Sequence, residues 1–389
     1  MTNLYKLPFL SSAMPKEHAA TVTPWEVKGE VDYDRLVKEF GIERVTPALL
    51  KRIEKLAGEQ HFMLRRGIFF AHRDLSWILD EYEKGNKFFL YTGRGPSGKI
   101  HLGHLFPWIF TRWIQERFDV ELWFQFTDDE KFLFERELSF EQVEAFLYEN
   151  ILDVIALGFN PEKTHFLIDT QHAGLFYKEA CKVAKKLTFS MVKASFGLNE
   201  QSNVGMIFYT SMQAVPAFLP SVLAKKEMPC LIPHAVDQDP HFRLTRDILP
   251  KLGHYKPASI QCPFLPPLTG MQGKMSSSEA DTAILTTDTP KDVERKIKKY
   301  AFSGGKDSVE EHRRLGGNPD IDVSFQYLKF LFEPDDKKLA TIAADYRSGK
   351  LLSGELKQYT IDKINAFLKE HQARREKARK EIGKFVYEG

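Results

Sequence analysis

Residues 88–126 read FFLYTGRGPSGKIHLGHLFPWIFTRWIQERFDVELWFQF, and this stretch decides the fold. Phe88–Tyr91 is a short apolar run bounded by turn residues, which predicts a buried strand. The glycine-rich segment 93–98 cannot lie inside a helix. Apolar residues at helical spacing from Leu102 to Trp113 then predict a helix, and alternating apolar residues from Val120 to Phe126 predict a second strand. Together these elements form a βαβ unit, whose crossover we expect to be right-handed.

Two further apolar runs, Pro229–Pro233 and Ala258–Ile260, predict additional core strands. With the βαβ unit they indicate an α/β fold that contains a doubly wound parallel sheet of the Rossmann-like kind. Pro107 falls early in the predicted helix, where we expect its missing N–H to cost little.

The rest of the chain divides around this sheet. We expect an N-terminal extension over residues 1–85 and the Rossmann-like domain over residues 86–290. A mostly helical insertion at about 135–200 interrupts the predicted sheet. Residues 291–389 show helical patterns throughout and predict an all-α C-terminal domain.

The composition is that of an ordinary globular protein, with 43% hydrophobic and 28% charged residues. No run of about 18 apolar residues occurs, so we expect no membrane span and no membrane partner. The first residues lack the basic and apolar regions of a secretory signal. Cys181, Cys230 and Cys262 lie far apart, which favours a reducing compartment, the cytoplasm, over a disulfide or zinc framework.

The charge is distributed unevenly along the chain. The formal net charge is only +2, but residues 291–389 hold 22 Lys and Arg against 17 Asp and Glu, a net charge of +5. A basic C-terminal third suits a polyanionic partner, and a solvated helical surface explains it equally well at this stage.

The glycine turn opens a helix that begins His101-Leu102-Gly103-His104. A helix N-terminus presents unpaired N–H groups and a partial positive charge, which suit a phosphate. His101 and His104 lie three residues apart on one face and can donate hydrogen bonds to phosphate oxygens, and Gly103 leaves room for a flat ring. A metal site would need a third ligand, which is not nearby. Two histidines that only cap a helix remain an alternative.

The second candidate segment is Lys274-Met275-Ser276-Ser277-Ser278, flanked by Gly270 and Gly273. This composition predicts a mobile surface loop. A lysine on such a loop can reach a leaving pyrophosphate and neutralise its charge. Alone, a loop rich in lysine and serine usually has no catalytic role.

Two other motifs point to different proteins. Gly93-x-Gly95-x-x-Gly98 matches the dinucleotide fingerprint of oxidoreductases, but in that fingerprint the last glycine already lies in the helix, and here the predicted helix begins after it. Ser303–Ser308 resembles a pyrophosphate-binding loop that follows a strand. Here it follows a charged helical stretch, and we interpret it as the turn that ends that helix.

In this order, HLGH (101–104) and KMSSS (274–278) resemble the two ATP-handling motifs of class I aminoacyl-tRNA synthetases. The wider pattern resembles the tryptophanyl-tRNA synthetases of archaeal and eukaryotic type, from about Phe62 to the C-terminus. The resemblance is carried by LRRGIFFAHRDL (64–75), YTGRGPSGKIHLGH (91–104), QFTDDEKF (125–132), VDQDPHFRLTRD (236–247), KMSSS (274–278) and AFSGGK…EEHR…GGN…DVSF (301–325).

The nearest alternative is a tyrosyl-tRNA synthetase, which shares the fold and a Tyr-x-x-x-Gln element, here Tyr209 to Gln213. In the archaeal and eukaryotic tyrosine enzymes an aspartate three residues later holds the phenol. Pro216 occupies that position here. A pocket without that carboxylate cannot hold the phenolic O–H, whereas an indole N–H needs only one acceptor.

The resemblance implies roles for the residues of the amino-acid pocket. Tyr91 and Gln125 would read the indole N–H, and Glu130, Gln213 and Gln238 would receive the α-amino group. Without the resemblance, Tyr91 and Gln125 are better explained as a core pair at the end of a strand.

The resemblance also implies an ATP site without a metal site built from protein ligands, since Mg²⁺ would bind to the phosphates of ATP. His101, His104, Lys131 and Lys274 would be catalytic. The other residues implied for the nucleotide are Gly93, Arg94, Gly103, Asp237, Met275, Ser276 and Ser278. The carboxylate of L-tryptophan would attack the α-phosphate, and tRNA(Trp) would then accept the acyl group.

The implied C-terminal domain binds the anticodon, and the implied assembly is a homodimer. Two alternatives from other classes remain: a catalytically inactive paralogue that binds tRNA, and the oxidoreductase considered above. The presence of His101, His104 and Lys274 argues against the inactive paralogue.

Overall fold

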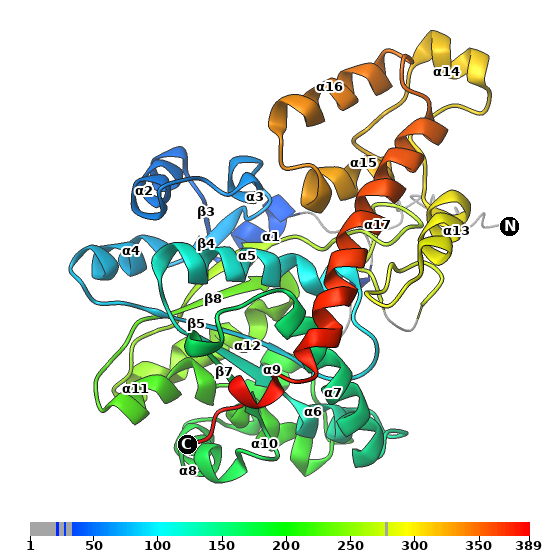
Figure 1. Ribbon diagram of the computed structural model, residues 1–389. Helices are drawn as coiled ribbons and strands as arrows, with labels where there is room; N and C mark the ends of the chain where they lie inside the picture. Colours follow the sequence, from blue (N-terminus) through cyan, green and yellow to red (C-terminus); the bar gives the residue numbers. More distant parts are fainter. Residues whose placement is uncertain (1–20, 23–26, 29–32, 277–278) are drawn as a thin grey trace, which may run out of the picture.

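A computed structural model describes residues 21–22, 27–28, 33–276 and 279–389. Its centre is a mixed seven-stranded sheet in the order β3-β4-β9-β8-β5-β6-β7, and β1 and β2 form a separate two-stranded pair (Figure 1). The strands are β1 Thr21–Val22, β2 Val27–Lys28, β3 Glu43–Arg44, β4 Ala71–Arg73, β5 Phe89–Arg94, β6 Leu122–Phe126, β7 Thr164–Ile168, β8 Cys230–Ala235 and β9 Ala258–Cys262.

Helices surround this sheet and form the C-terminal part of the chain (Figure 1). The α-helices are α1 Tyr33–Phe40, α2 Pro47–Ala57, α3 Phe62–Arg65, α4 Leu75–Glu83, α5 Leu102–Phe118, α6 Asp128–Phe134, α7 Phe140–Ala156, α8 Ala173–Ala184, α9 Phe189–Phe196, α10 Val204–Met212, α11 Leu219–Ala224, α12 Asp239–Ile248, α13 Pro290–Tyr300, α14 Val309–Leu315, α15 Val323–Tyr327, α16 Asp336–Arg347 and α17 Ser353–Ala378. The short helices are η1 Pro161–Lys163, η2 Val215–Ala217, η3 Val236–Gln238, η4 Leu249–Leu252, the π-helix η5 Leu328–Phe332 and η6 Ile382–Lys384.

The predicted βαβ unit is confirmed. Strands β5 and β6 pair in parallel, with Leu90 opposite Leu122, and α5 connects them. The chain then extends the sheet through β7 on one side, and later returns to place β8 and β9 on the other side of β5. The strand order therefore reverses between β5 and β8, and ligands of doubly wound sheets bind at such a switch point.

Pro107 does not lie at the start of its helix, as we expected, but in the interior of α5. Its missing N–H removes the intrahelical bond to the carbonyl of Gly103. The carbonyl of Pro107 itself accepts a hydrogen bond from the Thr111 hydroxyl at 2.9 Å.

The sheet is mixed, which corrects the expectation of a wholly parallel one. At one edge β4 runs antiparallel to β9, and β3 runs antiparallel to β4. Both strands come from residues before 86, so part of the predicted N-terminal extension belongs to the sheet. Large parallel sheets often carry such an antiparallel edge.

The insertion at about 135–200 is mostly helical, as predicted, but it does not simply interrupt the sheet. Residues Thr164–Ile168 form β7, which pairs in parallel with β6. The outer edge of β7 is covered by the C-terminal tail: Phe166 N–H donates to Phe385 O at 2.7 Å, and Tyr387 N–H donates to Phe166 O at 3.0 Å. This pairing leaves less unpaired backbone at the sheet edge.

Alternating side chains of the strands enter different cores on the two faces of the sheet. Leu90 and Phe124 pack with α5 and with the C-terminal helices in the larger core. Phe89, Tyr91 and Trp123 pack on the opposite face with residues of α8, α10 and α12. The sheet thus separates two hydrophobic cores.

The C-terminal third is helical, as predicted, and it packs closely on the sheet domain. The long helix α17 runs beside α7, with α14 and α16 near its N-terminal end (Figure 1). His371 of α17 lies 2.8 Å from the buried Asp153 of α7, and Arg375 lies 3.0 Å from the same carboxylate. The boundaries of the three predicted domains stay a prediction.

Candidate active site

A cavity of about 370 Å³ lies at the carboxyl ends of β5, β6 and β8. It brings together residues from the glycine turn, α5, α6, α10 and the loop at 274. Of the residues predicted from the sequence, it is lined by Tyr91, Gly93, Arg94, His101, Gly103, His104, Gln125, Glu130, Lys131, Gln213, Asp237, Gln238, Lys274 and Met275. Ser276 is not among the lining residues, and Ser278 lies outside the described residues.

Tyr91 and Gln125 form one end of the cavity and are 1% and 0% exposed. The Tyr91 hydroxyl lies 2.6 Å from Gln125 Oε1 and 3.1 Å from the backbone oxygen of Gln213. Burial raises the pKa of Tyr91 well above its ordinary value, so its hydroxyl stays protonated. The ring of Phe242 meets Tyr91 edge to face, with centroids 5.8 Å apart, and forms a flat wall.

The Tyr-x-x-x-Gln element forms one helical turn at the end of α10. Tyr209 lies in α10 and Gln213 caps its C-terminal end, and the Tyr209 hydroxyl donates to Gln213 Oε1 at 2.5 Å. Pro216 is buried in the adjacent η2. A proline has no side-chain polar group, so this position offers no acceptor to a phenol.

Glu130 sits in the first turn of α6 beside Lys131. Its carboxylate accepts a hydrogen bond from Thr127 at 2.7 Å and lies 3.1 Å from Lys131 Nζ. Burial opposes ionisation of Glu130, but Lys131 and Thr127 outweigh it and hold its pKa below the ordinary value. A carboxylate in this state suits an ammonium group.

Gly95 lets the glycine turn approach this pair closely. A Cβ at this position would lie 2.3 Å from Lys131 Cε and 2.6 Å from Glu130 Oε2. Only glycine fits without displacing the two charged side chains.

His101 and His104 begin α5, and their rings stack with centroids 3.6 Å apart. His104 Nδ1 accepts a hydrogen bond from the backbone N–H of His101 at 3.3 Å, so His104 also caps the helix. Burial, with Arg94 and Lys274 nearby, lowers the pKa of His101 to about 3, and burial lowers the pKa of His104 well below its ordinary value. Both rings are therefore neutral near pH 7.

Two polar atoms at this end of the cavity lack partners. Among the described residues, Arg94 Nη2 and His101 Nδ1 are buried without a hydrogen-bond partner. Arg94 Nε donates to Asn150 Oδ1 at 3.1 Å, and burial lowers the pKa of Arg94 to about 10, which still leaves it charged. Unpaired buried donors are costly unless a ligand pairs with them. A Cβ on Gly103 would lie 3.0 Å from the His101 ring, so this glycine keeps the space open.

Lys274 reaches the same end from its loop. Its Nζ lies 3.2 Å from Asp237 Oδ2, with about a third of its side chain exposed. Burial raises the pKa of Asp237, although the neighbouring Lys274 opposes the shift. Met275 is buried and holds the loop against Gly103.

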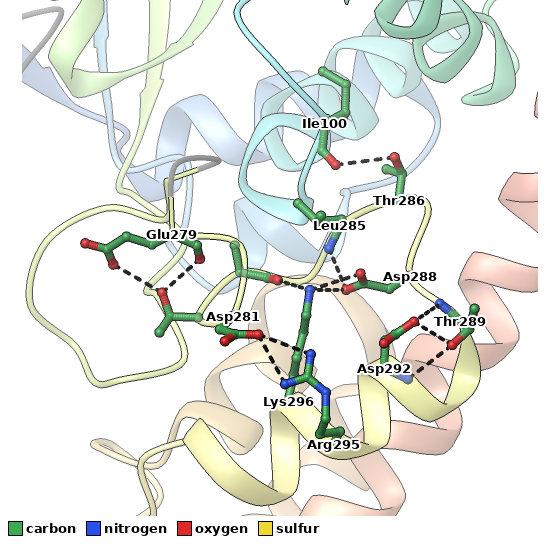
Figure 2. Close-up of polar contacts among 12 residues, drawn as sticks. Ile100, Glu279, Asp281, Leu285, Thr286, Asp288, Thr289, Asp292, Arg295 and Lys296 are labelled. Atoms are coloured by element: carbon green, nitrogen blue, oxygen red, sulfur yellow. Dashed lines mark hydrogen bonds and ion pairs between the residues drawn. The ribbon is translucent and has the colours of Figure 1, made fainter.

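The segment that follows the loop is anchored beside Ile100 (Figure 2), and Leu285 forms a backbone bridge with His101. Leu102 N–H donates to Ile284 O and Thr286 N–H donates to Ile100 O, both at 3.0 Å. The buried Lys296 lies 2.7 Å from Asp288 and also donates to Ala283 O at 2.9 Å. The chain that follows the Lys274 loop is therefore held against the start of α5 by hydrogen bonds.

The sequence did not reveal two residues that support the site. Asn150 of α7 holds Arg94 and donates to Gly98 O at 2.9 Å. Asp169 accepts from Gln125 Nε2 at 2.9 Å. Asp169 directly follows β7. We predicted residues 135–200 to be mostly helical, so the sequence did not place Asp169 at the end of a strand. Ser303–Ser308 follows α13, as predicted, but it is not the turn that ends the helix, because α13 stops at Tyr300 and its C-cap is Ala301.

The described residues contain no group of three or more His, Cys, Asp or Glu side chains that could hold a metal ion. No helix among them is long and apolar enough to span a bilayer. The unpaired nitrogens of Arg94 and His101 and the open space above Gly103 fit the phosphates and base of a nucleotide.

Residues 83–369 match the family described as tRNA synthetases class I (W and Y). The chain is 54% identical to the tryptophan–tRNA ligase of Saccharolobus solfataricus, over 97% of both chains. The tryptophanyl-tRNA synthetase structure from Giardia lamblia superposes with a TM-score of 0.87 at 41% identity, covering 92% of this chain and 96% of that one. The Encephalitozoon cuniculi structure bound to tryptophan superposes with a TM-score of 0.85 at 36% identity, covering 92% and 98%.

Proposed function

The chain belongs to the class I tRNA synthetases for tryptophan and tyrosine and acts as a ligase that joins tryptophan to its tRNA, and we propose that the cavity described above performs the activation step. One observation carries the proposal: at one end of the cavity the buried acceptor Gln125 Oε1 is fixed by Tyr91, and at the other end buried nitrogens of Arg94 and His101 have no partner. The first end suits the ring of an amino acid, and the second suits a polyphosphate.

At the amino-acid end, the indole N–H donates to Gln125 Oε1 or to the Tyr91 hydroxyl oxygen. Phe242 packs beside the ring. The α-ammonium group binds the Glu130 carboxylate, with Gln213 and Gln238 as further partners. The low pKa of Glu130 supports this role, because a charged carboxylate holds an ammonium group best.

At the nucleotide end, Arg94 and the neutral His101 and His104 donate to phosphate oxygens. The tryptophan carboxylate oxygen attacks the α-phosphorus, a new P–O bond forms, and the bond to the bridging oxygen breaks. Lys274 and Lys131 stabilise the negative charge that develops on the leaving pyrophosphate. No side chain acts as a nucleophile, so the residues position the reactants and stabilise charge.

ATP is a substrate, and we propose that Mg²⁺ enters bound to its phosphates and neutralises part of their charge. Asp237 holds Lys274 near the site before the nucleotide binds, because the two lie 3.2 Å apart. Gly93, Gly103, Met275 and Ser276 contribute the shape of the nucleotide site, and Ser278 would complete it.

We propose that the helices from α13 onward bind tRNA(Trp) at its anticodon. This region carries a net charge of +5, and Phe302, which follows α13, is 46% exposed. Unpaired bases stack on aromatic side chains, and Lys and Arg contact phosphates. The KM for tRNA should rise steeply with salt, whereas ATP–pyrophosphate exchange, which needs no tRNA, should change little.

We propose that two copies of the chain pair through α8 and α10 in the cytoplasm. Tyr177 of α8 is 63% exposed and Val204 of α10 is 82% exposed, and the ring of Phe208 lies 6.2 Å from that of Tyr177. Light scattering should give twice the chain mass, and Val204→Glu should lower it. A monomer at micromolar concentration would contradict this proposal.

The tyrosine-specific alternative is not favoured. Pro216 supplies no carboxylate, and the relatives described above are named for tryptophan. A crystal structure with tryptophan and a non-hydrolysable ATP analogue tests the assignment. We expect the indole nitrogen within about 3 Å of Gln125 Oε1 or Tyr91 Oη. An indole ring bound away from both residues would overturn it.

A further inference from the structure

We propose that Asp169 is a positioning residue that fixes the orientation of the Gln125 carboxamide and thereby gives the pocket its preference for a ring that carries an N–H group. The inference rests on the proposed function, in which Gln125 reads the indole. It adds a residue that lies outside the cavity and does not touch the substrate.

A carboxamide has a donor side and an acceptor side of nearly equal shape, so its orientation depends on its neighbours. Gln125 Nε2 lies 2.9 Å from both Asp169 oxygens, and Gln125 Oε1 lies 2.6 Å from the Tyr91 hydroxyl. The Asp169 oxygens favour the amide nitrogen as their partner. The amide oxygen must then face Tyr91 and the cavity.

This orientation decides what the pocket presents to a ligand. An amide oxygen has two lone pairs, and Tyr91 uses one, so one remains for an indole N–H. If the amide turned over, its NH₂ group would face the cavity. The Gln125 NH₂ group and the indole N–H are both donors, and they would then face each other without an acceptor. Gln125 is 0% exposed, so water could not reach them easily.

Asp169 is itself held in place. It is 1% exposed, and its backbone N–H donates to Phe126 O at 3.1 Å, which continues the pairing of β7 with β6. The next residue, Thr170, donates its backbone N–H to Asp128 Oδ1 at 3.1 Å. The backbone on both sides of the carboxylate is therefore fixed.

A second carboxyl group completes the arrangement. Asp129 forms a side-chain hydrogen bond with Asp169, and Asp129 Oδ1 accepts from the Glu130 backbone N–H at 2.7 Å. Burial raises the pKa of Asp169 well above its ordinary value and that of Asp129 to about 6. One proton shared by the pair lets Asp169 donate to Asp129 while it accepts from Gln125.

The experiment compares tryptophan with 3-(3-benzothienyl)-L-alanine, in which sulfur replaces the N–H group. The measured quantity is the ratio of kcat/KM for the two amino acids in ATP–pyrophosphate exchange. A site that pairs with an N–H group rejects an analogue that lacks it, so the wild type should prefer tryptophan by about 10²-fold or more.

Asp169→Leu removes every acceptor for Gln125 Nε2 at similar volume, and it should reduce this preference by about tenfold or more while the KM for ATP stays within about twofold. Asp169→Asn keeps an acceptor for Gln125 and a donor for Asp129, so it should retain the preference. Asp322→Asn changes another buried aspartate, one that caps α15 far from the cavity, and serves as the control. If Asp169→Leu does not fold, Asp169→Ala replaces it.

The double variant Gln125→Ala/Asp169→Leu separates this inference from the proposed function. If Asp169 acts through Gln125, its substitution should not reduce the preference further once Gln125 is absent. If Asp169→Leu lowers kcat/KM equally for both amino acids, Asp169 does not set the preference. Gln125 would then still be the residue that binds the indole N–H. An unchanged preference in Gln125→Ala would overturn the reading of the indole by Gln125, and the inference with it.

Discussion

The two ends of the cavity differ in how the polar side chains that we assign to the ring and to the phosphates are paired. At the amino-acid end, the side chains of Tyr91 and Gln125 are buried and hydrogen-bonded to each other. At the nucleotide end, Arg94 and His101 each keep a buried atom without a partner among the described residues. Tyr91 also packs in the core on one face of the sheet, whereas His101 begins a helix that packs on the other face.

The difference corresponds to the chemistry expected at each end. A neutral ring is selected by shape and by one hydrogen bond, which a rigid, satisfied frame provides. A polyphosphate brings negative charge that grows during the reaction, and it is stabilised by donors that have no competing partner. Substitutions at the two ends should therefore affect different kinetic constants.

The largest effect is expected at the nucleotide end. Lys274→Ala should lower kcat for ATP–pyrophosphate exchange by about 10²–10³, comparable to the loss of one donor to a developing anion. The KM for tryptophan should barely change, because Lys274 lies at the other end of the cavity. Steady-state kinetics measures both constants, and near-normal turnover would remove Lys274 from the mechanism.

The complementary effect is expected at the amino-acid end. Gln125→Ala should raise the KM for tryptophan by about 10- to 100-fold, since a lost hydrogen bond to a buried donor costs about 1–3 kcal/mol. The KM for ATP should rise less. Equal increases in both constants would show that the two ends do not act separately.

A smaller effect concerns the pH dependence of stability. The folded-state pKa of His101 is about 3, below the ordinary 6.5, so the unfolded chain binds the proton first and stability is lost as pH falls below 6.5. The folded-state pKa of Asp129 is about 6, above the ordinary 3.8, so its contribution is fully present below pH 3.8 and is lost as pH rises through 6. Between pH 7 and pH 5, a falling pH therefore lowers the contribution of His101 to the free energy of unfolding and raises that of Asp129.

Urea unfolding of two variants measures this difference. From pH 7 to pH 5, wild type should lose up to about 2 kcal/mol more stability than His101→Gln, because the glutamine does not titrate. Asp129→Asn should lack a gain of about 1 kcal/mol that the wild type has over the same range. Parallel pH curves for all three proteins would contradict the pKa directions given above.

The sequence predicted the nucleotide end better than the supports of the amino-acid end. HLGH and KMSSS are contiguous motifs, and the βαβ unit that carries the first follows from local periodicity. The contact between Asp169 and Gln125 depends on β7, a five-residue strand inside a region of helical pattern. Its role as a strand is set by pairing with β6, which no local pattern reveals.

The edge strands were missed for a similar reason. Strands β3 and β4 have two and three residues, and they exist because β9 offers an edge to pair with. Pro107 was placed at the helix start because proline is usually found there. The structure places it in the interior of α5 instead.

The most direct test of the account is ATP–pyrophosphate exchange by the wild-type protein with each standard amino acid in turn. The fixed acceptor at Gln125, which keeps one lone pair for an indole N–H, and the absence of a carboxylate at Pro216 predict that tryptophan alone supports exchange. Robust exchange with tyrosine would contradict this selection and leave only the nucleotide end of the account intact.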